Sequence, residues 1–182
     1  MKPIFVFCGP IGSGKSSVSK IFAKQIGAKW NSFGSAAREI AQERQVPNNR
    51  EDLQNLGAHL IENEREVFCK RVLSPVLVNG EEYGVIDGLR HADVLGELRS
   101  LVKPRKIYCI YVDVLPEVRL ARVGKRDGLD AAKIETLDGH STEVQVKTEL
   151  RKLADFIADN NGTAEDCVAH IVAWAKPCRP KS

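Results

Sequence analysis

The 182-residue sequence lacks any apolar stretch that approaches the roughly 20 residues of a membrane-spanning helix. Met1-Lys2-Pro3 lead directly into the first apolar run, so we expect no secretory signal peptide. A large excess of charge is missing too, because the formal net charge is only +3. That small excess gives no reason to expect nucleic acid or an acidic membrane as a partner. These absences favour a cytoplasmic protein.

Paired cysteines and clustered histidines are also absent. No C-x-x-C pair occurs among the five cysteines, which are Cys8, Cys69, Cys109, Cys167 and Cys178. The four histidines are just as scattered, at His59, His91, His140 and His170. This spacing argues against zinc motifs and disulfides. It favours reduced cysteines that act as small core hydrophobes in a reducing compartment.

The most informative motif is Gly9-Pro10-Ile11-Gly12-Ser13-Gly14-Lys15-Ser16, which fits the phosphate-loop pattern G-x-x-x-x-G-K-[ST] without a gap. An apolar run precedes it, and a helical pattern follows from Ser17. Glycines let successive N–H groups turn into one concavity, where the helix dipole also attracts anions. Lys15 can then reach the β- and γ-phosphates, and the Ser16 hydroxyl can ligate Mg²⁺. The motif predicts that residues 9–17 bind a nucleoside triphosphate, with Mg²⁺ at Ser16.

A second acidic feature is the apolar run that ends in Val85-Ile86-Asp87-Gly88. In phosphate-loop proteins, an aspartate at the end of a neighbouring strand holds Mg²⁺. An apolar run that ends in aspartate is common, so this interpretation depends on the loop. With the loop present, we expect Asp87 to lie beside Ser16 and to complete the metal site.

The remaining pattern predicts one α/β domain without repeats. Strands are expected at 4–8, 29–33, 83–86, 106–112 and 156–159. Helices are expected at 15–26, 35–44, 50–72, 92–102, 116–126, 142–154 and 164–175. Strands that alternate with helices favour a parallel sheet covered on both faces.

Two stretches interrupt that alternation. Residues 34–79 read as helix after helix, and residues 124–141 are polar, glycine-containing and irregular. Ligands of such folds lie at the carboxyl ends of the strands, so segments inserted there are candidates to cover a substrate. We expect residues 1–182 to form a single domain, with 34–79 as a helical acceptor-binding insertion and 124–141 as a lid.

Several arginines stand where phosphoryl transfer needs positive charge. Arg38 follows the second strand, and Arg90 follows the acidic strand. A third group precedes the irregular segment and consists of Arg119, Arg122, Lys125 and Arg126. Its three arginines are three and four residues apart, so they share one helix face. A solvated face is the ordinary explanation of such a run, but its position beside the expected lid favours a role in catalysis.

On these residues the chain resembles the nucleoside-monophosphate-kinase-type phosphate-loop kinases, the group that includes adenylate, cytidylate and dephospho-CoA kinases. Ser35-Ala36-Ala37-Arg38 is similar to the segment where these kinases place an arginine on the acceptor phosphate. Asp87-Gly88-Leu89-Arg90 is similar to their Asp-Gly-x-Arg stretch, whose arginine binds the same phosphate. Arg119-x-x-Arg122-x-x-x-Arg126-Asp127, with Asp138 and Glu143 beyond it, resembles their lid. Residues 154–163 resemble their last strand and the turn near which adenine lies.

The resemblance implies a three-layer α/β/α sandwich around a five-stranded parallel sheet in the order 2-3-1-4-5. It implies ATP on residues 9–17, Mg²⁺ between Ser16 and Asp87, and catalysis by Lys15, Arg122 and Arg126. Arg38 and Arg90 would bind a small-molecule phosphate acceptor, most simply a nucleoside or deoxynucleoside monophosphate. A monomer or homodimer would suffice.

The departures from the resemblance leave the acceptor open. Ser35 follows Gly34 where adenylate kinases usually carry aspartate, and Leu89 joins Gly88 directly to Arg90. A related kinase is therefore favoured over a standard adenylate kinase, with a dephospho-CoA-kinase-like or other small-molecule kinase as alternatives. An ATPase or nucleotide-binding regulator is the rival class, although it needs no second anion site. The polar face of 50–72, with Gln54, Asn55, His59 and Asn63, is a further candidate to line the acceptor pocket.

Overall fold

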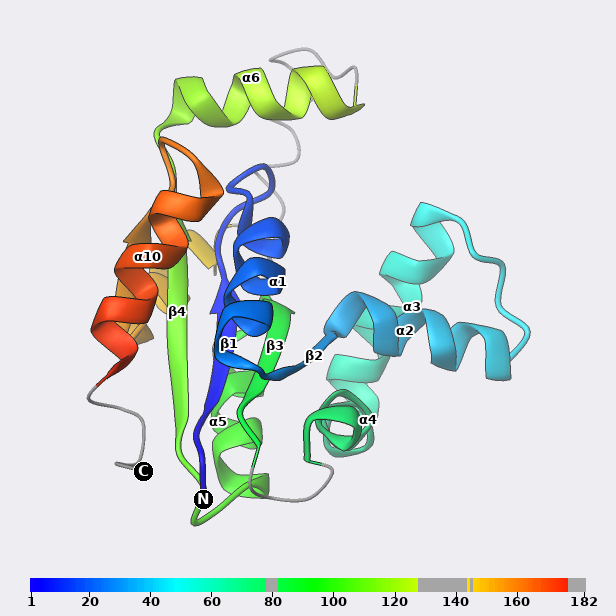
Figure 1. The fold of residues 1–182 in the computed structure, drawn as a ribbon. Coiled ribbons are helices and arrows are strands. Elements are labelled where there is room, and N and C mark those ends of the chain that lie inside the picture. The colour runs from blue at the N-terminus through cyan, green and yellow to red at the C-terminus, as the bar shows by residue number, and fades with distance from the viewer. Residues whose placement is uncertain (78–81, 128–143, 145, 177–182) are drawn as a thin grey trace.

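The computed structural model describes residues 1–77, 82–127, 144 and 146–176 (Figure 1). Its centre is a five-stranded parallel sheet in the order β2-β3-β1-β4-β5, which confirms the predicted topology. The strands are β1 (Ile4–Cys8), β2 (Lys29–Ser32), β3 (Gly84–Leu89), β4 (Ile107–Asp113) and β5 (Phe156–Asp159). Because β1 lies in the middle, its carboxyl end is flanked by those of β3 and β4.

Helices cover both faces of the sheet and make the predicted three layers (Figure 1). The long helices are α1 (Lys15–Ile26), α2 (Phe33–Glu43), α3 (Arg50–Asn63), α4 (Arg65–Leu77), α5 (Ala92–Leu101), α6 (Pro116–Asp127) and α10 (Ala164–Ala175). A π-helix, η1 (Val146–Leu150), and a short helix, α9 (Arg151–Leu153), precede β5. No helix in the described parts of the chain is long and apolar enough to cross a membrane.

Strand β1 explains why the sheet is covered twice. All five of its residues are fully buried, as expected for a central parallel strand. Successive side chains point to opposite faces. Phe5 and Phe7 pack against Phe22 of α1, with the Phe5 and Phe22 ring centroids 5.1 Å apart. Ile4, Val6 and Cys8 belong to the opposite core, beneath α2, α4, α5 and η1.

The described cysteines agree with the prediction of reduced core residues. Cys8, Cys69, Cys109 and Cys167 are buried free thiols, and Cys178 lies outside the described residues. Burial raises the pKa of Cys69 to about 12 and that of Cys167 to about 11. Since the thiolate is the reactive form, these thiols serve as packing groups.

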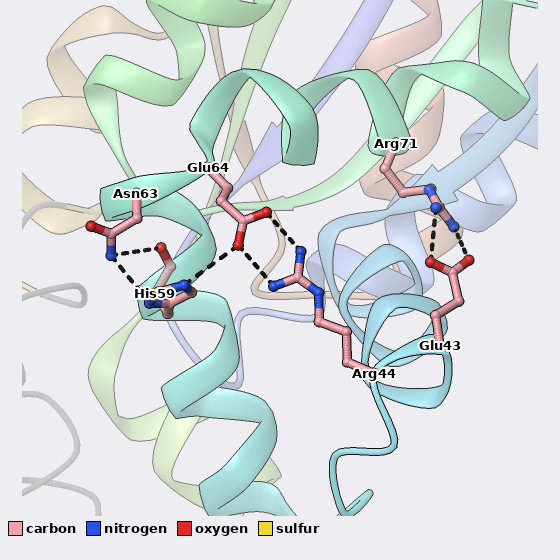
Figure 2. Close-up of polar contacts among 6 residues, drawn as sticks. All are labelled: Glu43, Arg44, His59, Asn63, Glu64 and Arg71. Carbon is pink, nitrogen blue, oxygen red and sulfur yellow. Dashed lines mark hydrogen bonds and ion pairs between the residues drawn. The ribbon is translucent and has the colours of Figure 1, made fainter.

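The prediction of one helix over 50–72 is wrong. Two helices, α3 and α4, meet at Glu64, whose φ of −134° and ψ of 32° are not helical and end α3. The Glu64 carbonyl then accepts from the Phe68 N–H and opens α4. Figure 2 shows the Glu64 carboxylate paired with both terminal nitrogens of Arg44, at 2.7 and 2.8 Å. Because Arg44 ends α2, this ion pair joins α2 to the break, and it is a tertiary contact that local periodicity does not reveal.

Strand β3 is also longer than the predicted 83–86. It continues through Asp87 and Gly88 to Leu89, with an irregularity of register where β1 passes from Phe7 to Cys8. Gly88 has a φ of +89°, which permits a bulge there. The sequence predicted that the strand ends at Asp-Gly, whereas these residues lie at a bulge within the strand.

The other boundaries shift by a few residues. Phe33, predicted in β2, begins α2, because the Ser32 hydroxyl caps that helix by accepting from the Ser35 N–H. The predicted helix 142–154 appears as η1 and α9, and residues 142, 143 and 145 lie outside the described residues. Of the expected lid, 124–127 belong to α6, and 128–141 lie outside the described residues.

Candidate functional site

The phosphate loop joins the carboxyl end of β1 to α1. Gly9 has a φ of +145°, and a Cβ there would lie 2.5 Å from the Val112 carbonyl oxygen of β4, so only glycine fits. Lys15 is 9% exposed, and its Nζ donates to the Pro10 carbonyl oxygen at 3.3 Å. The loop therefore curls back over its own lysine. In this position the ammonium group lies beside the first residues of the loop.

Ser16 and Asp87 are brought together, as the sequence predicted. The Ser16 hydroxyl donates to Asp87 Oδ2 at 2.6 Å. Asp87 is 5% exposed, and its Oδ1 has no hydrogen-bond partner within the described residues. Two hard oxygen ligands at the start of α1 fit Mg²⁺, which proteins bind through one or two carboxylates together with substrate phosphates. No group of three or more acidic, histidine or cysteine side chains that could hold a metal ion occurs in the described part of the chain.

Helix α6 lies across the phosphate loop (Figure 1). Arg119 is 7% exposed and donates to the Ile11 carbonyl oxygen at 3.5 Å. Arg122 donates to the carbonyl oxygens of Ser13, at 3.5 Å, and Gly162, at 3.0 Å. These two arginines thus face the loop rather than solvent. The side chain of Arg126 lies outside the described residues.

The two expected acceptor arginines follow neighbouring strands. Arg38 lies on α2, just after β2, where its exposed guanidinium donates to the Gly34 carbonyl oxygen of its own helix at 3.1 Å. Arg90 follows β3 and is half-buried. Because β2 and β3 are adjacent and parallel, α2, which carries Arg38, and the segment with Arg90 both leave the sheet at the edge that carries Asp87. The shared role of the two arginines stays a prediction.

The helical insertion holds its own ion pairs, which use part of the polar face expected to line the acceptor pocket (Figure 2). His59 lies 3.4 Å from Glu64, and Asn63 contacts the His59 side chain. The Arg44 guanidinium holds the pKa of Glu64 below its usual value, and Arg71 on α4 does the same for Glu43 on α2. His59 and Asn63 are therefore engaged with the junction of α3 and α4.

One contact was missed in the sequence. Asn160 follows β5 and is 2% exposed, and its amide Nδ2 donates to the Ser13 carbonyl oxygen at 2.7 Å. The only sequence signal was the Asn160-Asn161-Gly162 turn, which marks a loop but not its partner. A second missed feature is a cavity of about 520 Å³ at the carboxyl ends of β4 and β5, bordered by Pro10, Tyr111, Leu115, Arg119, Arg151 and Ile157.

A family model described as an AAA domain matches residues 5–144 of the sequence. The chain belongs to this family. A UPF0200 protein of Pyrococcus horikoshii is 30% identical over 167 residues, which cover 88% of this chain and 89% of that protein. The dephospho-CoA kinase of Escherichia coli K12 is 26% identical over 194 residues, covering 95% of this chain and 91% of that enzyme.

Solved structures agree on the fold. The chain resembles shikimate kinase from Acinetobacter baumannii, solved with shikimate, with a TM-score of 0.65 and 19% identity. The match covers 100% of this chain and 97% of that one. Together with the sheet order, the comparisons show that the chain has the fold of phosphate-loop kinases of the nucleoside-monophosphate-kinase type.

Proposed function

We propose that this protein is an ATP-dependent phosphotransferase that moves the γ-phosphoryl group of ATP to a small, phosphate-bearing acceptor. A nucleoside or deoxynucleoside monophosphate is the acceptor class that fits best. The observation that carries the proposal is the distribution of arginines along the carboxyl edge of the sheet. Arg122 contacts the loop from α6, whereas Arg38 and Arg90 follow β2 and β3 on the other side. Hydrolysis of ATP alone needs no second set of cations.

In this proposal, different residues bind the donor, the metal and the acceptor. Loop N–H groups and Lys15 bind and orient the phosphates of ATP, while Arg119 and Arg122 hold α6 against the loop. Ser16 and Asp87 would hold Mg²⁺, which neutralises charge on the phosphates when bound. Arg38 and Arg90 would fix the acceptor phosphate. Catalysis then consists of positioning and charge neutralisation, and needs no covalent intermediate.

A second candidate is phosphorylation of a hydroxyl group on a larger nucleotide. The named Escherichia coli relative is a dephospho-CoA kinase and aligns with 95% of this chain. Ser35 also replaces the aspartate usual in adenylate kinases, so the acceptor pocket differs from theirs. Both observations favour keeping dephospho-CoA beside the monophosphates as a test substrate.

The test is a panel of acceptors incubated with ATP and Mg²⁺. It contains the nucleoside and deoxynucleoside monophosphates, dephospho-CoA and shikimate, and ADP and phosphorylated product are both measured. Stoichiometric ADP and phosphorylated product with one acceptor class supports the proposal. ADP and free phosphate released equally with and without every acceptor would assign an ATPase instead. A Lys15→Ala sample run in parallel identifies contaminating activity.

A further inference from the structure

We infer that Asn160 is a positioning residue that aims the phosphate loop at the β-phosphate of the nucleotide. The inference rests on the proposed function, because it assumes that the loop binds ATP. Asn160 is 2% exposed and donates from Nδ2 to the Ser13 carbonyl oxygen at 2.7 Å, across 147 residues of sequence. Arg122 donates to that same oxygen at 3.5 Å.

The geometry of the peptide bond links this contact to nucleotide binding. A trans peptide is planar, and its C=O and N–H point in opposite directions. When Asn160 holds the Ser13 carbonyl, the Gly14 N–H is therefore fixed on the opposite side of the same plane. Loop N–H groups of this kind cradle the phosphates of a bound nucleotide. Asn160 thereby sets the direction of one phosphate-binding donor without touching the nucleotide.

The approach of Asn160 to the loop is unusually close. A Cβ on Gly14 would lie 2.5 Å from Asn160 Nδ2, and Gly14 has a φ of +81°. Glycine at this position is therefore required by the asparagine as well as by the backbone conformation. The oxygen of the same amide lowers the stability of the fold, because Asn160 Oδ1 is buried and lacks a hydrogen-bond partner among the described residues. An apolar side chain would avoid that cost but would release the Ser13 carbonyl.

The turn that carries Asn160 is itself held in place. The Asn160 backbone N–H donates to the Asp113 carbonyl oxygen of β4 at 2.9 Å. Asn161 Oδ1 accepts from the Leu115 N–H at 2.7 Å, just before α6. The Thr163 hydroxyl caps α10 by accepting from the Asp166 N–H at 3.1 Å. Hydrogen bonds therefore fix the turn that carries Asn160. A residue that positions another group must itself be held in place.

The experiment compares nucleotide selectivity by isothermal titration with ATP, ADP and adenosine for the wild type, Asn160→Ala and Asn160→Asp. Adenosine has no phosphate for the loop to bind, and unlike a nucleoside monophosphate it does not belong to the proposed acceptor class. The aspartate keeps the shape but replaces the donor with an acceptor that repels the Ser13 carbonyl. We expect both variants to lose about tenfold or more in affinity for ADP and ATP, with affinity for adenosine changed less than about twofold. Asn48→Ala is the control, because it removes an exposed amide between α2 and α3 and leaves both the Ser13 contact and the turn after β5 intact.

The outcomes separate the inference from the proposed function. A wild type that binds neither ATP nor ADP overturns the proposed function. Normal wild-type binding with equal losses for ADP and adenosine in the Asn160 variants, or with no loss, overturns the positioning role. If Asn160→Ala does not fold, Asn160→Ser and the isosteric Asn160→Asp decide by the same ratio. If none of the variants folds, Asn160 is a structural residue and the inference is wrong.

Discussion

Asp87 provides the sharpest test of the site. Replacing a carboxylate that is kept to bind Mg²⁺ should raise the stability of the metal-free protein and lower its activity. Its carboxylate is 5% exposed, accepts one hydrogen bond from Ser16 at 2.6 Å, and has an Oδ1 without a partner within the described residues. We expect Asp87→Asn to stabilise the metal-free protein and to remove Mg²⁺-dependent phosphotransfer. A residue kept for folding alone would behave in the opposite way.

The magnitude follows from the hydrogen bonds. Asparagine keeps an oxygen to accept from Ser16 and leaves a neutral amide where the carboxylate left an unpartnered charged oxygen. An unsatisfied buried polar group costs about 1–3 kcal/mol, and more when it is charged. Replacing the charged group should therefore stabilise the metal-free fold by about 1 kcal/mol. For a domain of 182 residues this corresponds to a rise in Tm of about 2–4 °C.

The assay is thermal unfolding in EDTA, repeated with Mg²⁺ and a non-hydrolysable ATP analogue, together with phosphotransfer. We expect Asp87→Asn to melt above the wild type in EDTA, to gain less from the magnesium nucleotide, and to lose at least about a hundredfold in kcat/KM. Asp93→Asn is the control, since Asp93 is a surface carboxylate paired with Arg65. A lower Tm for Asp87→Asn in EDTA, or retained Mg²⁺-dependent transfer, would refute the reasoning.

Three further predictions address the loop, the acceptor and the insertion. Lys15→Ala should reduce transfer at least about a hundredfold with little change in Tm, and substantial remaining transfer in a rate assay would disprove the role of the loop. Arg38→Ala should raise the KM of the acceptor about tenfold or more and leave the KM of ATP unchanged, whereas Arg99→Ala should alter neither; equal effects on both substrates would count against the assignment. The folded-state pKa of Glu64 is lowered from 4.5 by Arg44, so this pair stabilises the fold above about pH 4.5 and loses that contribution as the pH falls through the lower, folded value. Hydrogen exchange of α2 and α3, measured down to pH 3, should show this loss in the wild type and not in Glu64→Gln, and identical pH profiles would contradict it.

The elements that the sequence predicted well are those whose signals are local. The apolar run of β1, the glycines of the loop and the helical spacing of α1 are continuous in the chain, and they fix a strand, a turn and a helix in order. The prediction of one continuous helix over 50–72 failed at Glu64, where the break coincides with a contact that is not local. Arg44 is 20 residues away, and no periodicity within 50–72 reports that ion pair.

The same distinction holds within the site. Ser16 and Asp87 are 71 residues apart, yet their contact was predictable, because parallel topology places the carboxyl ends of β1 and β3 side by side. The contact between Asn160 and Ser13 obeys the same topology, since the turn after β5 reaches the loop past the end of β4. It escaped prediction because an asparagine in a turn has a sufficient local explanation as a turn former. Burial decides between the two explanations: an asparagine needed only for its turn can remain in solvent, whereas Asn160 is 2% exposed and its side-chain amide donates to the phosphate loop.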